Sequence, residues 1–319
     1  MSRVVGIDIG GTKTHIVVAP ADPSVEPGSD PASGPREIVV PSASWRGGLG
    51  DFEADANGLR ALLLEHVGPE VLTAPLAVGA HGCENTAQCR QLEHALRARF
   101  SGPVAVMNDS ELIAPAMGHE RAIGVVVGTG AIATTRDANG ELVSAGGWGW
   151  LLGDEGSAAG LVRDATRAVL RELDRGGSFD QLGRRLLASF AASDGDELAL
   201  AVTNAASAEE WGSHAPEVFA AADDGSAIAA EVIAEAGEHL AWLVHQLLER
   251  GVPADGVVAG GSVIQRQALL QNAFAAAMGR DHPGVALTIL DKPPVLGAVA
   301  VAHRIAREQK VNTIQIGDK

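Results

Sequence analysis

Basic side chains are scarce in this chain of 319 residues. Four residues are lysine, the formal net charge is −16 at pH 7, and lysine and arginine form no cluster along the sequence. Nucleic acids and anionic membranes bind basic patches, so the composition excludes both as expected partners. A phosphate-bearing ligand would have to be neutralised by a metal ion and by backbone dipoles instead of by many cationic side chains.

Cysteines, secretory features and long hydrophobic runs are also lacking. The two cysteines suit reduced thiols better than a disulfide framework, and glycine or charge interrupts the apolar runs well short of membrane-spanning length. The chain enters its first strand directly after Arg3, without the basic stretch, apolar core and cleavage site of a secretory signal. We therefore expect a cytoplasmic protein without a membrane anchor.

Apolar residues, in contrast, are abundant and follow strand-like and helix-like patterns. Hydrophobic residues make up 46% of the sequence and the mean hydropathy is +0.11, which suffices for a large core. Strand and helix patterns alternate, and a chain of this length usually divides into two domains. We expect an α/β fold with two lobes, at residues 1–118 and 119–319, and a final helix able to pack back on the first lobe.

The expected elements follow from apolar periodicity and turn residues. In the first lobe we expect two strands within 4–19, strands at 38–41, 75–79 and 104–107, helices at 51–67 and 86–100, and a helix-like stretch ending at 117. The tract from Pro20 to Pro35 has too little apolar content to pack and is expected to be a flexible connection. In the second lobe we expect strands at 123–127 and 131–136, a third strand after the turn at 138–140, and strands at 257–258 and 287–290. Helices are expected at 157–174, 178–190, 195–205, 225–249 and 295–308. The helical pattern is interrupted around 211–216.

The first of three glycine turns lies near the start of the chain. An apolar run ends at Asp8 and Ile9, and Gly10, Gly11, Thr12 and Thr14 follow before a second apolar run. Glycines let backbone N–H groups approach phosphate oxygens, threonine hydroxyls can donate to them, and an Asp at a strand end can hold hydrated Mg2+. The hairpin therefore predicts a phosphate site with its metal at Asp8.

Two later turns repeat this pattern at the ends of apolar runs. They are Gly128-Thr129-Gly130 and Gly260-Gly261-Ser262. A cleft between two similar lobes could hold a nucleoside triphosphate, with the first two turns on the phosphates and the third on the adenosine side. The alternative is that these are three unrelated structural turns.

These motifs resemble the actin-like superfamily of sugar kinases and heat-shock ATPases. Within it, the chain is most similar to N-acetylglucosamine kinases and the BadF/BadG/BcrA/BcrD ATPase family, through the turns above together with Asn108-Asp109-Ser110, Gly146-Gly147-Trp148-Gly149 and Gly153-Asp154-Glu155-Gly156-Ser157. The resemblance covers nearly the whole chain. It implies two ribonuclease-H-like lobes with an interlobe cleft that closes over MgATP and a hexosamine, in a homodimer.

The resemblance identifies Asp109 as the catalytic base and, with Asn108, as a sugar-binding residue. Phosphoryl transfer requires that the attacking sugar hydroxyl be aimed in line and that its proton be accepted, which an Asp at a strand end can do. The alternative is that Asp109, Asn108 or Ser110 only caps the helix that follows.

A second segment resembles the sugar-binding loop of the family. Gly146 and Gly147 would offer backbone groups to sugar hydroxyls, Trp148 would cover the ring, and Asp154 would accept hydrogen bonds from the sugar. Capping of the next helix by Asp154 or Glu155, and a core position for Trp148, remain the alternatives. Whether Glu155 or Lys13 contacts a ligand stays open.

The chain departs from the resemblance in one loop. Many relatives have an Asn after the third strand that touches the sugar, whereas residues 41–48 contain none, and Ser42, Ser44 or Arg46 would have to replace it. This leaves open whether the acceptor is an acetylated or a free amino sugar. His81, Cys83 and Cys89 lack the spacing of a metal site and are expected to be structural.

Together these features predict an ATP-dependent kinase that converts N-acetylglucosamine to N-acetylglucosamine 6-phosphate with Mg2+. A glucosamine kinase of the same fold is the first alternative. An ATPase that activates a radical dehydratase is a second, and it would need cysteines for an iron-sulfur cluster at a subunit boundary. A sugar-sensing regulator would need a DNA-binding module, and the hairpin that begins at residue 4 leaves no room for one.

Overall fold

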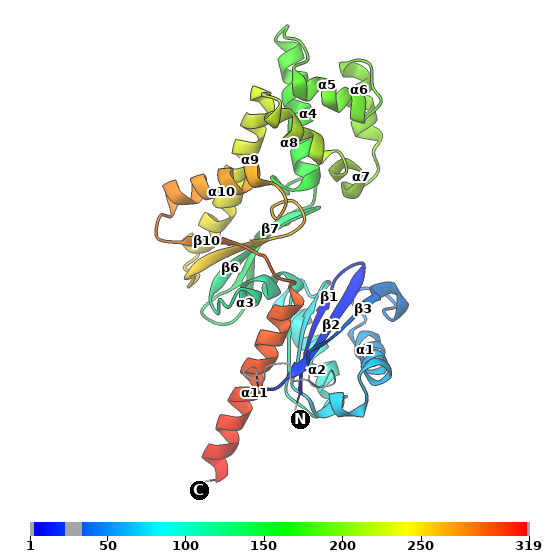
Figure 1. Cartoon of the computed structure of the whole chain (residues 1–319), viewed down its shortest axis with the longest axis vertical. Coiled ribbons are helices and arrows are strands. Elements are labelled where there is room, and N and C mark those ends of the chain that lie inside the picture. The colour runs from blue at the N-terminus through cyan, green and yellow to red at the C-terminus, as the bar shows by residue number, and fades with distance from the viewer. Residues whose placement is uncertain (1–2, 23–33, 318–319) are drawn as a thin grey trace. The chain divides into compact units, whose positions relative to one another are not determined.

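A computed structural model of the chain describes residues 3–22 and 34–317 (Figure 1). Residues 23–33 of the connection expected between Pro20 and Pro35 lie outside the described residues. The chain divides into two compact units, and each is described here by itself. Unit 1 comprises Met1–Glu120 and Asp291–Lys319, and unit 2 comprises Arg121–Leu290.

Unit 1 contains a five-stranded mixed sheet in the order β3-β2-β1-β4-β5. The strands are β1 (Arg3–Ile9), β2 (Lys13–Pro20), β3 (Arg36–Pro41), β4 (Leu76–Ala80) and β5 (Val104–Met107). The hairpin β1-β2 and the pair β2-β3 are antiparallel, whereas β1, β4 and β5 are parallel. Because parallel strands end at the same edge of a sheet, the residues that follow β1, β4 and β5 lie near one another.

Helices cover both faces of this sheet. One face packs against α1 (Phe52–His66) and α2 (Thr86–Arg97), and the other against α11 (Val295–Gly317). The short helix α3 (Ile113–Ala116) packs against α11. Short 3-10 helices are η1 (Ser42–Ser44), η2 (Pro69–Thr73) and η3 (Asp109–Leu112). A Cβ on Gly6 of β1 would lie 2.5 Å from the backbone nitrogen of Val299, so this glycine permits the close contact between β1 and α11.

Unit 2 repeats the topology of the first sheet, in the order β10-β9-β6-β7-β8. Its strands are β6 (Ala122–Val127), β7 (Ala131–Arg136), β8 (Leu142–Gly146), β9 (Gly256–Gly260) and β10 (Ala286–Ile289). Again an antiparallel meander, β6-β7-β8, continues into parallel strands. The glycine turn after β6 therefore corresponds in position to the turn after β1.

The helices of unit 2 depart from expectation in two places. They are α4 (Ala158–Asp174), α5 (Gln181–Ser189), α6 (Gly195–Asn204), α7 (Ala208–Gly212), α8 (Ala215–Asp223), α9 (Ala227–Glu249) and α10 (Ala268–Asp281). Helix α10 was not expected, and α7 and α8 lie on either side of the expected interruption. The many alanines of α10 are neither clearly apolar nor clearly polar, so its sequence does not show the helical spacing of apolar residues.

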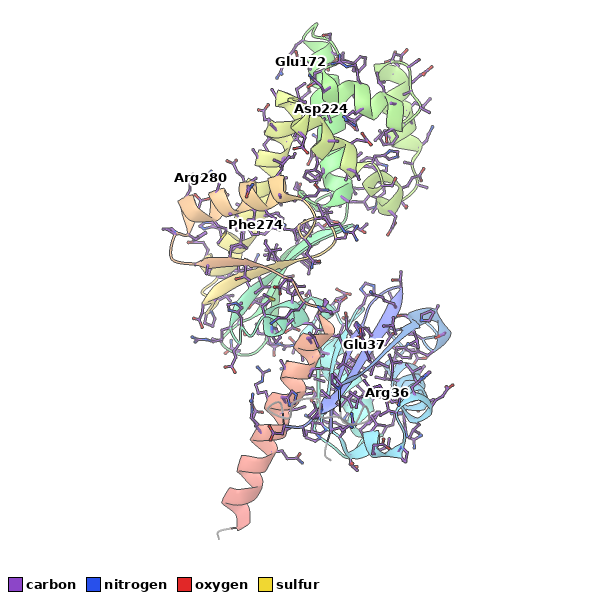
Figure 2. The ribbon with its side chains drawn as sticks, viewed as in Figure 1. Arg36, Glu37, Glu172, Asp224, Phe274 and Arg280 are labelled. Atoms are coloured by element: carbon purple, nitrogen blue, oxygen red, sulfur yellow. The ribbon has the colours of Figure 1, made fainter. Side chains whose placement is uncertain are left out.

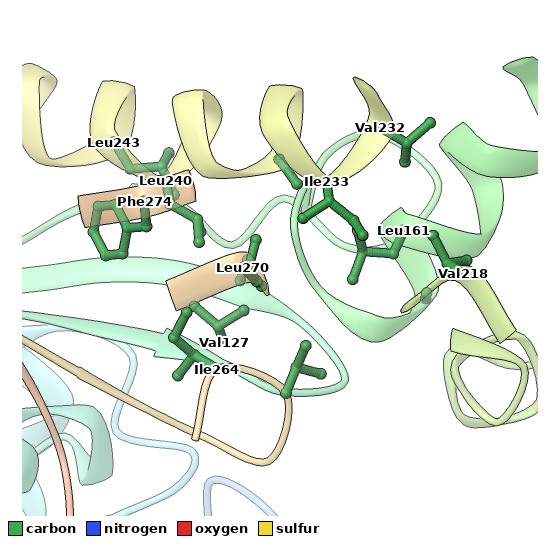
Figure 3. Close-up of a cluster of buried hydrophobic side chains, with 14 of the residues drawn as sticks. Val127, Leu161, Val218, Val232, Ile233, Leu240, Leu243, Ile264, Leu270 and Phe274 are labelled. Atoms are coloured by element: carbon green, nitrogen blue, oxygen red, sulfur yellow. The ribbon is translucent and has the colours of Figure 1, made fainter. Parts of the chain in front are cut away.

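The core of unit 2 accounts for α10. Its Phe274 is fully buried, and Figure 3 shows it in one cluster with Leu240 and Leu243 of α9 and Val127 of β6. Near the C-terminal end of α10 lies the exposed Arg280, labelled in Figure 2, which pairs with Glu238 of α9. None of the helices described in residues 3–22 and 34–317 has both the length and the apolar character that a membrane crossing requires.

Candidate active site

In unit 1, a tight turn connects β1 to β2 at the sheet edge. The backbone N–H of Gly10 donates to the carbonyl of Lys13 over 3.0 Å, and Gly11, Thr12 and Lys13 are exposed. The turn therefore places Gly10, the exposed Gly11 and the exposed hydroxyl of Thr12 directly after the strand that carries Asp8. This is the geometry that a phosphate group can approach closely.

Thr14, in contrast, is fully buried. Its hydroxyl lies 3.0 Å from the Ser42 hydroxyl and accepts a hydrogen bond of 2.9 Å from Trp45 Nε1. The Ser42 hydroxyl also donates to the carbonyl of Gly10 over 2.8 Å. Thr14 therefore ties the loop after β3 to the glycine turn within unit 1.

Two carboxylates at this edge have raised pKa values. The pKa of Asp8 is raised to about 6, chiefly by burial and then by the charge of Asp109, while Lys13 opposes the shift. Burial likewise raises the pKa of Asp109, whereas His81 and the backbone N–H of Ser110 lower it. An acid pair that resists ionisation suits a divalent cation, which would neutralise both charges.

The residues after β5 show which side chain caps the helix that follows and which stays exposed, a question that the sequence left open. Asn108 is the N-cap of η3: its side chain accepts from the backbone N–H of Ser110 over 2.9 Å and donates to the carbonyl of Cys83 over 3.1 Å, and Glu111 completes a capping box. With its amide bonded inside the unit and only 7% of the residue exposed, Asn108 acts as the cap of η3 and has little exposed surface. The Asp109 side chain remains 33% exposed.

The loop after β3 provides no free replacement for the missing Asn. Ser42 is buried and bonded to Gly10 and Thr14, and Ser44 donates to the carbonyl of Pro41. Arg46 forms a buried ion pair of 2.8 Å with Asp55. All three side chains that were expected to substitute are used within unit 1.

In unit 2, the turn after β6 adjoins two other predicted segments. Gly128 donates to the carbonyl of Gly130 over 2.9 Å, and a Cβ on Gly128 would lie 3.5 Å from the Ser262 hydroxyl. A Cβ on Gly130 would lie 3.0 Å from an Asp154 carboxylate oxygen. The structure therefore brings together the turn at Gly128 to Gly130, the turn at Gly260 to Ser262, and Asp154.

The turn after β9 requires a glycine. Gly261 has φ +114°, and a Cβ there would lie 2.4 Å from the carbonyl oxygen of Val127. The same carbonyl accepts from the backbone N–H of Val263 over 3.1 Å. Both the backbone conformation and the lack of space exclude any side chain at Gly261.

The loop after β8 has its glycines in left-handed conformations and its tryptophan on the surface. Gly146 and Gly147 have φ of +78° and +73°, and the N–H of Gly147 donates to the carbonyl of Ala131. Trp148 is 75% exposed, which rules out the core position that the sequence left open. A broad apolar ring is thus available beside the predicted sugar-binding glycines.

Asp154 is a strained residue that points back to the phosphate turn. It has φ +58° and is 8% exposed, and burial raises the pKa of its carboxyl, although backbone N–H groups of Ala131 and Gly149 partly offset the shift. Strain at a buried acid is typical of a functional position. The cap of α4 is Ser157, whose hydroxyl accepts from Gly160, so neither Asp154 nor Glu155 is needed for capping.

Arg163 of α4 was missed by the sequence analysis. Its Nη1 donates to the carbonyls of Trp150 and Gly153 over 2.7 and 2.6 Å, and Nη2 lies 3.5 Å from Glu155. Glu155 also pairs with His239 of α9 over 3.2 Å. These contacts hold the loop from Gly147 to Gly156 in place, and no local pattern distinguishes Arg163 from any other helical arginine.

The two cysteines belong to the core of unit 1. Cys83 and Cys89 are 0% and 2% exposed, and they contact each other through the Cys89 thiol and the Cys83 carbonyl. In the part of the chain that the structure describes, no three His, Cys, Asp or Glu side chains are grouped closely enough to hold a metal ion.

Comparison with known proteins identifies the family. The sequence profile of the BadF/BadG/BcrA/BcrD ATPase family matches residues 76–302. The chain is a member of this family. The resemblance stated from the sequence motifs is thereby confirmed.

A relative from Clostridium acetobutylicum, named N-acetylmuramic acid/N-acetylglucosamine kinase, is 27% identical to this BadF/BadG/BcrA/BcrD ATPase family member over 315 residues, covering 95% of this chain and 99% of the relative. Among solved structures, a protein from Chromobacterium violaceum provisionally assigned as an N-acetylglucosamine kinase matches with a TM-score of 0.60 at 20% identity, over 95% of this chain and 99% of that one. A glucokinase of the ROK family from Streptomyces griseus matches with a TM-score of 0.55 at 18% identity, over 96% and 100%. The expected actin-like α/β fold class is confirmed.

Proposed function

We propose that this family member is an ATP-dependent kinase that transfers the γ-phosphoryl group of ATP to the 6-hydroxyl of N-acetylglucosamine. The observation that carries the proposal is the partly exposed carboxylate of Asp109 at the sheet edge that also bears Asp8 and the Gly10 turn. The similarity to the Clostridium acetobutylicum kinase over 95% of the chain supports the acceptor class.

Asp109 is the proposed catalytic base. The attacking hydroxyl of the sugar gives its proton to the Asp109 carboxylate as the new bond to phosphorus forms, and the bond to the leaving oxygen of ADP breaks. Backbone N–H groups of Gly10, Gly11 and Thr12 in unit 1, and of Gly128, Thr129 and Gly130 in unit 2, are assigned to the phosphate oxygens, where they stabilise the charge. We assign Thr14 to positioning the Gly10 turn and Asn108 to positioning the segment that carries Asp109.

The remaining assignments lie in unit 2. Gly260, Gly261 and Ser262 are proposed for the adenosine side, and Gly146, Gly147, Trp148 and Asp154 for the sugar. An exposed Trp148 beside two glycines suits a sugar ring, which offers one apolar face and a rim of hydroxyls.

Mg2+ fits the acids of unit 1. The charge of Asp109 adds to the cost of ionising Asp8, the charge of Lys13 opposes this effect, and Asp8 would hold the ion through water. When bound, Mg2+ supplies charge neutralisation for the phosphates. The pair of acids and the shortage of lysines both favour such an ion.

The test is ADP release at fixed MgATP with N-acetylglucosamine, glucosamine, N-acetylmannosamine, glucose or no acceptor. Asp109→Asn is expected to lose at least about a thousandfold in turnover while keeping a melting temperature no lower than that of the wild type and an unchanged ATP affinity, because the base is lost and the fold is kept. Asp196→Asn, at an exposed acid of α6, is the matched control and should retain wild-type turnover. Turnover of the wild-type protein with none of the sugars, or substantial turnover by Asp109→Asn, would contradict the proposal.

A glucosamine kinase is the second candidate. Ser42, Ser44 and Arg46 are all used within unit 1, so the loop after β3 offers no free side chain to select an acetamido group. The ratio of kcat/KM for N-acetylglucosamine to that for glucosamine decides between the two. Activation of a radical dehydratase is disfavoured, because a cluster at a subunit boundary needs accessible thiols and both cysteines are buried.

A homodimer is also proposed, following the resemblance. Light scattering coupled to size-exclusion chromatography tests it, since a dimer has twice the mass of 32.7 kDa.

A further inference from the structure

We propose that His81 is a positioning residue that orients the Asp109 carboxylate for the transfer reaction. The inference rests on the proposed function, in which Asp109 is the base. His81 was expected to be structural, and none of the sequence motifs includes it.

The topology of unit 1 places His81 between the two functional segments. It directly follows β4, the middle strand of the parallel set β1-β4-β5. On one side β1 leads into the Gly10 turn, and on the other β5 leads into Asp109. The first side chain after the middle strand therefore has a phosphate-binding turn and the catalytic base as its neighbours.

The two edges of the His81 ring face these two neighbours. Nδ1 lies 4.0 Å from Asp109 Oδ2. On the other edge, a Cβ placed on Gly11 would lie 3.6 Å from Cδ2 and 3.8 Å from Nε2. The side chain is 44% exposed, so substrates can reach the same space.

The backbone of His81 is held from both directions. Its N–H donates to the carbonyl of Ile9 over 2.8 Å, and its carbonyl accepts from Arg46 Nη1 over 2.8 Å. Arg46 is itself fixed by the buried ion pair with Asp55, whose side chain is 2% exposed. Burying such a pair stabilises little by itself, so its clearest consequence here is a fixed position for His81.

The two oxygens of the Asp109 carboxylate have different neighbours. The backbone N–H of Ser110 donates to Oδ1 over 3.0 Å, and Oδ2 faces His81 Nδ1. One oxygen is hydrogen-bonded to the backbone, and the other lies 4.0 Å from the imidazole nitrogen. A small movement of the His81 ring on substrate binding closes this gap to hydrogen-bond distance, which orients the carboxylate and leaves the second lone pair of Oδ2 available for the sugar hydroxyl. His81 also offsets the negative charge of Glu84 beside Asp109.

Replacing His81 by Asn or Gln tests the two ring nitrogens one at a time. Asn places its amide nitrogen near the position of Nδ1, whereas Gln places it near that of Nε2, and Phe keeps the ring without either nitrogen. In the full-length enzyme with MgATP and its best sugar, His81→Phe is expected to lower kcat by about 10- to 100-fold with the KM for ATP changed by less than about threefold. His81→Asn should recover kcat to within about fivefold of wild type, and His81→Gln should not.

Several results would overturn the inference. These are a kcat of His81→Phe within twofold of wild type, equal losses in the Asn and Gln variants, or a rise in the KM for ATP alone, which would assign His81 to phosphate. If the Phe variant fails to fold, the comparison of Asn with Gln decides. His66→Phe, at the end of α1, is the control and should keep wild-type kinetics. A wild-type protein inactive on every sugar would overturn the proposed function instead, and this inference with it.

Discussion

Replacing Asp8 by Asn should stabilise the protein while abolishing its activity. The pKa of Asp8 is raised from its ordinary value of 3.8 to about 6, first by burial and then by the charge of Asp109. The folded state therefore binds the Asp8 proton more tightly than the unfolded state. This contribution to stability is present below pH 3.8 and is lost as the pH rises through about 6.

The size of the effect follows from the shift. About two pKa units at 1.36 kcal/mol each give an upper bound of roughly 3 kcal/mol at pH 8, and solvent screening reduces it to about 1 to 2 kcal/mol. Asn has the shape of Asp without the charge, so Asp8→Asn removes this penalty. For a unit of this size we expect a melting temperature about 3 to 6 °C higher at pH 8 without Mg2+, and no gain near pH 4.

The assay is thermal unfolding from pH 4 to pH 8, with EDTA or with MgATP, alongside ADP release. MgATP should raise the melting temperature of the wild-type protein and raise that of Asp8→Asn much less, because the variant lacks the metal-associated acid. Asp55→Asn is the contrasting control: its carboxylate is paired with Arg46, so its loss should destabilise by about 3 to 5 kcal/mol. A variant at Asp8 that is less stable than wild type at pH 8, or that retains turnover, would refute the reasoning.

Two further predictions concern unit 2. Arg163→Met releases the carbonyls that hold the loop after β8, so the KM for the sugar should rise at least about tenfold with the KM for ATP within about threefold; an unchanged sugar KM in steady-state kinetics would contradict this. Gly261→Ala forces a Cβ to within 2.4 Å of the Val127 carbonyl at φ +114° and should destabilise by more than about 2 kcal/mol in urea unfolding. Gly279→Ala is its control, because a Cβ there meets nothing within 4 Å and should stabilise α10 by about 0.5 to 1 kcal/mol; equal effects at the two glycines would sink the argument.

Much of the fold could be predicted because its signals are local. The strands of both sheets and the helices α1, α2, α4, α5, α6 and α9 were expected near their observed positions, since β-branched runs, apolar periodicity and capping residues act within a few residues of one another. Helix α10 was missed because alanine fits both the buried and the exposed side of a helix. Its identity as a helix is decided by packing against α9, where Phe274 is buried.

The sequence predicted which segments form the candidate site, but not the orientation of the individual side chains within them. Each glycine turn follows an apolar run, and that combination is visible without a structure. Which side chain of a segment faces outward was not visible. Thr12 and Thr14 look equivalent in the sequence, yet Thr14 is fully buried beneath Ser42 and Trp45. Asn108 and Asp109 likewise look equivalent, and only hydrogen bonds to Cys83 and Ser110 assign the cap to Asn108.

The sequence by itself determined the family, the α/β class, the three glycine turns and the choice of Asp109 as the proposed base. Tertiary structure alone decided that Thr14 and Asn108 support the site from within, that Arg163 holds the loop after β8, and that His81 faces Asp109. The physical reason for this difference is the separation in sequence between the residues that make each contact. Strands and turns arise from neighbouring residues, whereas His81 and Asp109 are 28 positions apart and meet only because β4 and β5 are paired in parallel.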